Sequence, residues 1–449
     1  MDTIVALATG NTTAGISIIR VSGENALDIS KKLLTKDKVF VPRYMYLCEV
    51  TAGNIHDKGL VVYFKAPNSF TGEDVVEFHL HGGMALSHAV LEALIMSGAR
   101  LAEAGEFSKR AFLNGKTSLD SLEGTIDLIN AQSEAELKAG YNLLIGTLKD
   151  KTENIQSALT DILAEIDVAL DYPDEDIEYE TTESIKNKIS LVAKDISALI
   201  DTSKTGSIIS SGINVAIVGK PNVGKSSLLN GLLAYDRAIV TDIAGTTRDI
   251  LRESYVFDSI RVNLTDTAGI HDSNDTVEKI GIERSIRAIN EAHLILLVLD
   301  SATPLDAEDE RIISICAKES KPVIVALNKS DIKQFDMFDK ISSLLPTAHI
   351  IETSAHDQTA LNDLKRLIKS LCVNDFDANA LFITNTRHLA CLQSALHKLA
   401  LALDNIDIVS LDCISVHLKD AWNNMGEITG KVITEEVLDA IFSKFCLGK

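Results

Sequence analysis

Hydrophobic positions change their spacing along the chain and so separate several regions. Residues 1–117 contain short runs rich in β-formers, such as GISIIRVSG and DVVEFHLHGG, around one helical stretch at 84–97. Between 118 and 211 the apolar positions follow the period of a helix, most clearly from Ile155 to Leu170. These patterns predict an α+β region followed by long amphipathic helices.

Residues 212–371 show another pattern, in which apolar strands such as INVAIVG and HLILLVLD alternate with helical stretches. This alternation predicts a mostly parallel sheet with helices on both faces. After 372 the pattern is helical again and contains no proline. We therefore expect a multidomain α/β protein, with one helical domain split by an inserted domain; two separate helical domains are the alternative. The expected segments are an N-terminal α+β domain (1–117), a first helical half (118–211), the inserted domain (212–371) and a second helical half (372–449).

Composition narrows the class of protein. The chain has 449 residues, and no apolar run reaches the roughly 18 residues that span a bilayer. The start, MDTIVALATG, lacks the features of a signal peptide. Six cysteines occur without CxxC spacing, which is typical of the reducing cytoplasm. Together, these features predict a cytoplasmic protein with no membrane partner. The net charge of −21 disfavours unspecific binding to nucleic acids, although it is compatible with a local basic patch.

A phosphate-binding motif opens the inserted domain. GKPNVGKSS (219–227) follows the strand INVAIV and matches G-x-x-x-x-G-K-[ST]. Backbone N–H groups of such a loop surround a β-phosphate, and the following helix adds positive potential. Lys225 is expected to reach the β- and γ-phosphates, and Ser226 to ligate Mg²⁺. The strand–loop–helix context makes this a strong indication of a nucleoside triphosphate site.

Three further motifs follow in order, each at the end of a strand. In DTAG, Asp266 can approach Mg²⁺ and the Gly269 N–H can face a γ-phosphate. In NKSD, Asn328 and Asp331 can bind guanine, whereas adenine lacks the N1 donor that the carboxylate needs. TSA can offer a backbone N–H to the guanine O6. In such sheets ligands bind at the carboxyl ends of the strands, which is where these motifs stand. From the four motifs in this order, the inserted domain is interpreted as a Ras-like P-loop GTPase domain.

The segment TDIAGTTRD lies between the first two of these motifs. Thr246 and Thr247 are both candidates for closing over Mg²⁺, and their spacing does not choose between them. Ras-like enzymes place a water-orienting glutamine just after DTAG, but Ile270 occupies that position here. Since an aliphatic side chain cannot orient water, we expect another catalytic device. Arg248 is a candidate arginine finger, and a solvated arginine is the simpler interpretation.

Motifs along the whole chain carry a resemblance to a known family. They are GISIIRVSG, SFTGEDVVEFHLHGG, GEFSKRAFLNGK, GKPNVGKSSLLN, TDIAGTTRD, DTAGI, VEKIGIERS and the terminal FCLGK. In these motifs and their order the chain resembles the MnmE (TrmE) family of tRNA-modification GTPases, over essentially all its residues. The resemblance implies an N-terminal folate-binding and dimerisation domain, and a helical domain that surrounds the GTPase domain.

The resemblance also implies how GTP is held and hydrolysed. A potassium ion takes the place of an arginine finger, and Glu278 helps to position water indirectly, while Lys225 contacts the phosphates. The implied K⁺ ligands are Asn222, Thr241, Ile243 and Thr246, and the implied Mg²⁺ ligands are Ser226 and Thr247, with Asp266 acting through water. The implied GTP contacts are Asn222, Val223, Gly224, Lys225, Ser226, Ser227, Thr241, Asp242, Ile243, Ala244, Gly245, Thr246, Thr247, Asp266, Thr267, Ala268, Gly269, Asn328, Lys329, Asp331, Ser354 and Ala355.

A second implied site binds 5-formyltetrahydrofolate or another one-carbon tetrahydrofolate. Arg20, Glu77 and Lys116 match the family's binding positions, and the terminal Cys-x-Gly-Lys adds Lys449, with Cys446 near the one-carbon unit. A pterin edge suits a carboxylate, and a glutamate tail suits cations. Taken singly, each charged residue also fits an ordinary surface ion pair, and the cysteine fits a buried thiol.

The implied function is K⁺- and Mg²⁺-dependent GTP hydrolysis coupled to tRNA modification. The homodimer, in a heterotetramer with an FAD-containing MnmG/GidA-type protein, adds an aminomethyl or carboxymethylaminomethyl group to C5 of wobble uridine, and tRNA binds largely through that partner. The alternative is a ribosome- or RNA-associated GTPase switch without modification chemistry. His79 and His81 alternate on one strand face as a possible metal pair, and ordinary strand-face histidines are the preferred interpretation.

Overall fold

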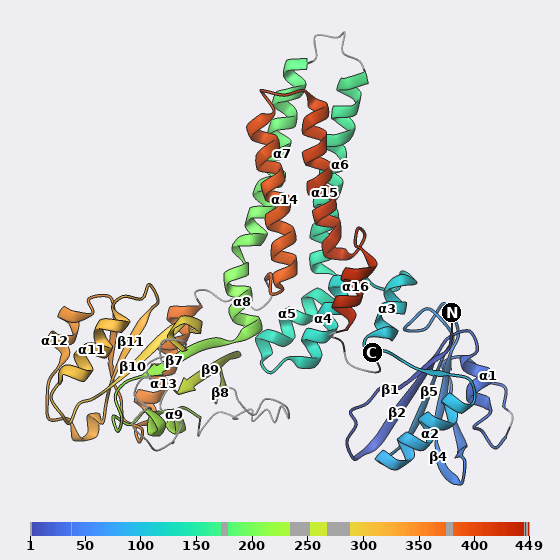
Figure 1. Ribbon diagram of the computed structural model, residues 1–449, viewed down its shortest axis with the longest axis horizontal. Coiled ribbons are helices and arrows are strands. Elements are labelled where there is room, and N and C mark those ends of the chain that lie inside the picture. The colour runs from blue at the N-terminus through green and yellow to red at the C-terminus, as the bar shows by residue number, and fades with distance from the viewer. Residues whose placement is uncertain are drawn as a thin grey trace. The chain divides into compact units, whose positions relative to one another are not determined.

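The structure is a computed structural model that describes residues 2–36, 38–171, 178–233, 252–266, 288–373, 380–443, 445 and 448, without the side chains of 178–181, 252 and 266. The chain forms two compact units, which are described separately (Figure 1). The first comprises Met1–Ile126, Leu143–Ile189 and Lys398–Lys449, and the second comprises Asp127–Asn142 and Ser190–His397. The four expected segments stay a prediction of domain organisation.

The first unit contains an α+β fold on a six-stranded sheet in the order β3-β4-β5-β2-β1-β6. Its neighbouring strands are antiparallel, apart from the parallel pair β1 and β6. The strands are β1 (Ile4–Leu7), β2 (Ala14–Ser22), β3 (Met45–Ala52), β4 (Ile55–Phe64), β5 (Val75–Gly82) and β6 (Arg100–Leu101), and the helices are α1 (Ala26–Lys31), α2 (Met84–Met96) and α3 (Glu106–Leu113). The predicted helix at 84–97 is confirmed as α2.

Alternation along the strands decides which side chains reach each face of this sheet. On β2, Ile19 and Val21 join the core with Val90 of α2, so Arg20 points to the opposite face. Arg20 and Glu77 of β5 are partners in the strand register, which places both on that opposite face.

Helices make up the remainder of the first unit, and some of them continue into the second unit. In the first unit α6 and α15 lie side by side, with Gln156 Nε2 donating to Trp422 O at 3.0 Å. Buried residues of α6 recur at helical spacing, as the sequence predicts. The helices are α4 (Leu119–Asn130), α5 (Glu134–Leu144), α6 (Thr147–Asp171), α7 (Glu178–Asp201), α8 (Ser203–Ser211), α14 (Thr386–Asn405), α15 (Leu411–Thr429) and α16 (Glu435–Phe442).

The second unit is built on a six-stranded sheet in the order β12-β11-β10-β7-β9-β8, parallel except for β8 against β9. The strands are β7 (Ile213–Val218), β8 (Arg252–Phe257), β9 (Ile260–Asp266), β10 (Leu294–Asp300), β11 (Val323–Asn328) and β12 (His349–Glu352). The helices are α9 (Lys225–Leu233), α11 (Ala307–Cys316), η1 (Ser330–Ile332), α12 (Phe338–Leu344) and α13 (Gln358–Cys372).

Two hydrophobic cores cover this sheet. One includes Leu228 of α9 and Leu364 of α13, and the other includes Ile313 of α11 and Ile341 of α12. Burial on both faces explains why the runs of β10 and β11 are apolar without alternation. The predicted fold class is thereby confirmed: an α+β N-terminal part, long helices and a mostly parallel α/β block. Across the described helices, none combines the length and the apolar run that crossing a bilayer requires.

Candidate functional site

The phosphate loop at 219–224 joins β7 to α9 in the second unit. Gly219 and Gly224 have φ angles of 148° and 94°, which L side chains rarely adopt. A Cβ on Gly219 would lie 2.4 Å from Val298 O, and one on Gly224 would lie 2.3 Å from Asn328 Nδ2. Both positions therefore require glycine, and the loop backbone lies directly against β10 and β11.

Lys225 places a positive charge at this loop. Its Nζ donates to Gly219 O and to Lys220 O, both at 2.7 Å, and the residue is 5% exposed. Lys225 is the first residue of α9, and Ser226 follows it in the same turn. The Lys225 ammonium and the N-terminus of α9 are thus brought to the loop, as binding a phosphate requires, and Ser226 is the next residue in the chain.

Strand β11 delivers Asn328 to the same loop. Its Nδ2 donates to Val223 O at 2.9 Å, and its backbone carbonyl accepts from Ser301 Oγ at 2.7 Å. Among the described atoms, the buried Oδ1 of Asn328 has no hydrogen-bond partner. A buried amide oxygen without a donor is unfavourable, so a donor supplied by a ligand fits this position.

Lys329 lies across the phosphate loop. The residue has a φ of 61°, and its Nζ lies 3.2 Å from Asn222 O and 2.6 Å from Asp300 Oδ2. Sequence reasoning did not select Asp300. Its place as the last residue of a buried strand, like that of Asn328, was the signal that could have identified it.

The third strand end of this edge belongs to β12. Thr353 N donates to Leu327 O at 2.9 Å, which holds Ser354 and Ala355 next to the end of β11. Asp331, in η1, is exposed to solvent. The described parts of the phosphate loop, NKSD and TSA therefore meet at one edge of the sheet, and their donors and acceptors fit a guanine nucleotide.

Several predicted ligands cannot be placed on this edge. Asp266 ends β9 beside Ile217 of β7, and its side chain lies outside the described residues. The residues wholly outside them are Thr241, Asp242, Ile243, Ala244, Gly245, Thr246, Thr247, Arg248, Thr267, Ala268, Gly269, Ile270 and Glu278. Their roles stay predictions.

In the first unit, Arg20 and Glu77 form a largely buried ion pair. Arg20 Nε lies 2.8 Å from Glu77 Oε1, and His79 Nε2 lies 3.3 Å from the other carboxylate oxygen. The guanidinium carbon of Arg20 lies 5.3 Å from the ring centre of Phe70 and 5.8 Å from that of Phe107. Sequence reasoning missed the two phenylalanines, although both stand inside motifs that it had singled out.

The end of the chain reaches this cluster. Gly448 O lies 3.5 Å from Arg20 Nη1, and a Cβ on Gly448 would lie 2.2 Å from the carbonyl oxygen that ends β1. Phe445 is buried in a small core with the ends of α4 and α16. The residues adjacent to Cys446 and Lys449 are therefore packed within the first unit, whereas Cys446 and Lys449 themselves lie outside the described residues.

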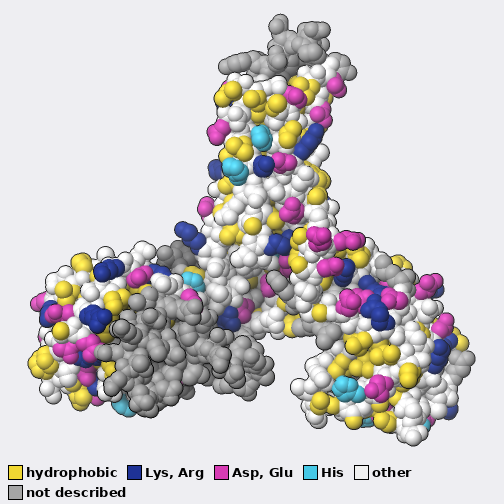
Figure 2. Space-filling model, viewed as in Figure 1, with side chains coloured by type: hydrophobic (Ala, Val, Ile, Leu, Met, Phe, Trp, Pro, Cys, Tyr) yellow, Lys and Arg dark blue, Asp and Glu magenta, His cyan; other side chains and the backbone are white. Residues whose placement is uncertain are grey.

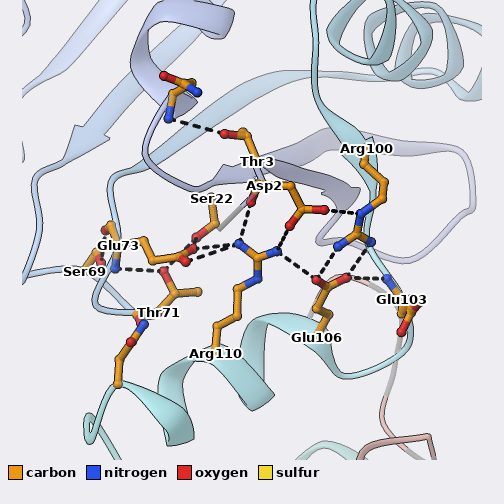
Figure 3. A network of polar contacts seen from close by, with 12 residues as sticks. Asp2, Thr3, Ser22, Ser69, Thr71, Glu73, Arg100, Glu103, Glu106 and Arg110 are labelled. Atoms are coloured by element: carbon orange, nitrogen blue, oxygen red, sulfur yellow. Dashed lines mark hydrogen bonds and ion pairs between the residues drawn. The ribbon is translucent and has the colours of Figure 1, made fainter.

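Buried Arg110 of α3 lies among the carboxylates of Asp2, Glu73 and Glu106 (Figure 3). Its Nη2 donates to Asp2 Oδ1 at 2.8 Å and to Glu106 Oε1 at 2.9 Å, and its Nη1 donates to Glu73 Oε2 at 3.1 Å. A hydrogen bond from Arg100, with further help from Arg110, lowers the pKa of Asp2 to about 2. These bonds tie α3, which carries Phe107, to the loop at 66–73, which carries Phe70.

Lys116, His79 and His81 are the other residues of this part of the chain that the sequence suggested as ligands. Lys116 Nζ donates to Pro67 O at 2.8 Å, so Lys116 contacts the loop at 66–73. His81 pairs with Asp57, its Nδ1 lying 2.7 Å from Oδ1, while His79 pairs with Glu77. The described residues contain no group of three His, Cys, Asp or Glu side chains arranged for a metal ion.

A parallel α/β sheet with a glycine-rich loop, a buried lysine at the next helix and an Asn-Lys-x-Asp strand end defines a P-loop GTPase fold. Comparisons with known proteins extend this class to a family. A model of the MnmE helical domain matches residues 119–446, and a model of the GTP-binding protein TrmE N-terminus matches residues 3–116.

Relatives match over the full length. The tRNA modification GTPase MnmE of Clostridioides difficile (strain 630) is 41% identical over 457 residues, covering 100% of this chain and 99% of that protein. The protein of the same name from Lactobacillus gasseri is 40% identical, covering 100% and 98%. The solved G domain of the T. maritima FeoB iron transporter is 27% identical over 36% of this chain and 99% of its own, with a TM-score of 0.29. The chain belongs to the MnmE family.

Proposed function

We propose that this chain is a GTPase that hydrolyses GTP with Mg²⁺ and K⁺ in order to modify wobble uridine in tRNA. Membership of the MnmE family supports the GTPase class and the link to tRNA, since the full-length relatives are named tRNA modification GTPases. The single observation that best supports guanine binding is the hydrogen bond from Asn328 to Val223 O. This bond joins the phosphate loop to the strand end that is proposed to contact the base.

The residues at the sheet edge have separate roles in this proposal. The Lys225 ammonium exchanges its hydrogen bonds to Gly219 O and Lys220 O for contacts with the β- and γ-phosphates. Ser226, Thr247 and Asp266 would hold Mg²⁺, and Asn222, Thr241, Ile243 and Thr246 would hold K⁺. When bound, the two ions supply positive charge beside the phosphates. Asp331 accepts the guanine N–H groups, and Glu278 helps to position the attacking water.

The Arg20 cluster is proposed to bind a one-carbon tetrahydrofolate, such as 5-formyltetrahydrofolate. Glu77 accepts N–H groups of the pterin, and Arg20, Lys116 and Lys449 supply cations for its carboxylates. The packing of Gly448 beside Arg20 supports this, because Gly448 belongs to the terminal Cys-x-Gly-Lys motif. Cys446 is then adjacent to the one-carbon unit.

The partners are also proposals. The sheet face that carries Arg20 exposes Ile16, Leu47 and Leu60, which are 61%, 54% and 38% exposed, and this apolar face supports a homodimer through the N-terminal part. Figure 2 shows hydrophobic side chains gathered on that part of the chain. An FAD-containing MnmG/GidA-type protein completes a heterotetramer in the cytoplasm and supplies most of the tRNA surface, in keeping with the net charge of −21. The added group is aminomethyl or carboxymethylaminomethyl, at C5.

Two measurements test the function. GTP turnover is compared in K⁺ and in Na⁺ at equal ionic strength, and equal rates would exclude the potassium role. Wobble nucleosides are analysed in tRNA from a strain that lacks the gene, and they should lose the C5 substituent. Unchanged nucleosides would instead favour the alternative of a ribosome- or RNA-associated GTPase switch.

A further inference from the structure

The β8–β9 hairpin stands between the two segments proposed to contact GTP. TDIAGTTRD precedes β8, and DTAG begins at the last residue of β9. Asp258 and Ser259 form the turn, with φ angles of 47° and 69°. Two consecutive non-glycine residues rarely adopt this conformation, and it persists where the surroundings hold it.

Helices hold this turn from both sides. Ser259 O accepts from Ala135 N at 3.1 Å, and Ser259 Oγ donates to Glu134 Oε2 at 3.0 Å, both at the start of α5. On the other side, Lys369 of α13 binds the carboxylate of Asp258. The turn is therefore fixed to the start of α5 and to α13, and both segments belong to the same compact unit as the hairpin.

Arg261 of β9 adds contacts to both the segment before α5 and the end of α8. Its Nη1 donates to Gln132 Oε1 at 2.7 Å, and its Nη2 donates to Ser210 O at 3.0 Å. Its Nε lies 3.2 Å from Glu136 Oε1, although the pair does not have hydrogen-bond geometry. The Glu136 side chain is 9% exposed, so loss of Arg261 would leave a largely buried carboxylate without its cation.

Helix α4 continues from this contact toward the tail of the chain. Its last residue, Asn130, lies two positions before Gln132, while Leu119 and Leu122 at its other end pack with Phe442 and Phe445. Gly448, three residues after Phe445, lies beside Arg20. One continuous helix therefore begins at the residues that hold the tail and ends next to the residue that Arg261 holds.

We propose that Arg261 is a positioning residue that couples the GTP-contacting segments to α4, with Gln132 as its hydrogen-bond acceptor and Glu136 as its ion-pair partner. GTP binding changes TDIAGTTRD or DTAG, and this change displaces the β8–β9 hairpin that lies between them in the sequence. The contacts of Arg261 pass the displacement to α4. A packed helix held at both ends is the kind of element that transmits such a change. The inference rests on the proposed function only in assuming that these segments contact GTP.

Backbone hydrogen exchange of the full chain tests the coupling, with GDP and a non-hydrolysable GTP analogue as the probes. In the wild type, exchange of residues 119–136 should differ about tenfold between the two nucleotides. In Arg261→Gln and in Glu136→Gln the difference should fall below about twofold, while affinity for both nucleotides stays within about twofold. Arg366→Gln, an exposed arginine paired with Asp363 in the same unit, is the matched control and should behave as the wild type.

The two variants remove the same contact from opposite sides, which separates coupling from folding. A nucleotide-dependent difference that persists in both variants overturns the inference. So does a variant whose exchange rises equally in both nucleotide states, because that result indicates a purely structural role. The double variant Arg261→Glu with Glu136→Arg should recover the difference at least in part. If the wild type does not bind the analogue, the proposed function fails; if it binds without any change in α4, only this inference fails.

Discussion

The two candidate sites of this protein are constructed in opposite ways. At the carboxyl edge of the β7–β12 sheet, the site consists of strand ends and loop backbone, and Asn328 meets the phosphate loop through a hydrogen bond to Val223 O. On the face of the β1–β6 sheet that carries Arg20, the cluster consists mainly of side chains. Strand register places Arg20 beside Glu77, and folding of the chain brings Arg20 to Gly448, which is 428 positions away in the sequence.

This difference explains how each site can fail. The phosphate loop allows no added Cβ at Gly219 or Gly224, because the new atom would lie 2.4 Å from Val298 O or 2.3 Å from Asn328 Nδ2. A side-chain cluster tolerates small backbone adjustments, but it loses its charge balance when one partner is removed. Substitutions that distinguish these two behaviours therefore test the comparison.

The largest effect is expected from Gly224→Ala. The left-handed conformation costs a non-glycine residue about 1–2 kcal/mol, and the new Cβ would displace Asn328 Nδ2, which lies 2.3 Å from its position. Together with the lost buried hydrogen bond, we expect affinity for GDP to fall by two to three orders of magnitude, to be measured by calorimetry. Gly15→Ala, where a Cβ meets nothing within 4 Å, is the control. Unchanged affinity would contradict a backbone-built site.

Asp331→Asn should change which base is bound. An amide cannot accept both N–H groups of guanine, so we expect affinity for GTP to fall about a hundredfold. Xanthosine triphosphate, whose base presents an acceptor where guanine has its amino group, should gain affinity. Competition binding with the two nucleotides measures this change. A variant that weakens both nucleotides equally would argue against contact between Asp331 and the base.

Arg20→Gln should affect only the other site. Loss of a charge-assisted hydrogen bond of about 1.5–3 kcal/mol predicts at least about a tenfold lower affinity for 5-formyltetrahydrofolate. Affinity for GTP should not change, which sharpens the distinction between the two sites. Lys58→Gln, an exposed lysine on the same sheet, is the control. Equal binding of the carrier by both variants would exclude Arg20 as a ligand.

The smallest effect concerns pH and the support beneath the Arg20 cluster. Asp2 has its pKa lowered to about 2, mainly by Arg100, so its contribution to stability is present above its ordinary pKa and is lost as the pH falls toward 2. Arg100→Gln should raise the pKa of Asp2 toward its ordinary value, as measured by NMR titration. The stability change should stay below about 1 kcal/mol, because Asp2 is solvent-exposed. Asp306, with a pKa of about 2 that it owes mainly to Lys220, is the internal control and should not shift.

Much of the nucleotide site was predictable because each of its motifs is local. A loop that must turn with positive φ requires glycine within a few residues, and a strand end places Asn328 by its position in a parallel sheet. Asp300 was missed because a lone aspartate at a strand end has no motif around it, and only its pairing with Lys329 reveals its place. The ligands between β7 and β10 that lie outside the described residues remain predictions.

The Arg20 cluster was less predictable. Family resemblance indicated Arg20, Glu77 and Lys116, but residue types alone would equally have allowed surface ion pairs. Phe70 and Phe107 come from a loop and a helix, which the bond from Arg110 to Glu73 joins across the chain. The contact between Arg261 and Gln132 joins residues 129 positions apart, and no short motif could have indicated it.

By itself, the sequence determined the periodic elements, the parallel α/β block and the order of the guanine-nucleotide motifs. Each of these depends on residues close together in the chain, where spacing and backbone conformation are decided locally. Only the tertiary structure decided which carboxylate faces Arg20, where Phe445 and Gly448 pack, and which helix holds the β8–β9 hairpin. Those contacts depend on strand register and on the packing of distant segments, and many sequences with the same local patterns could satisfy them differently.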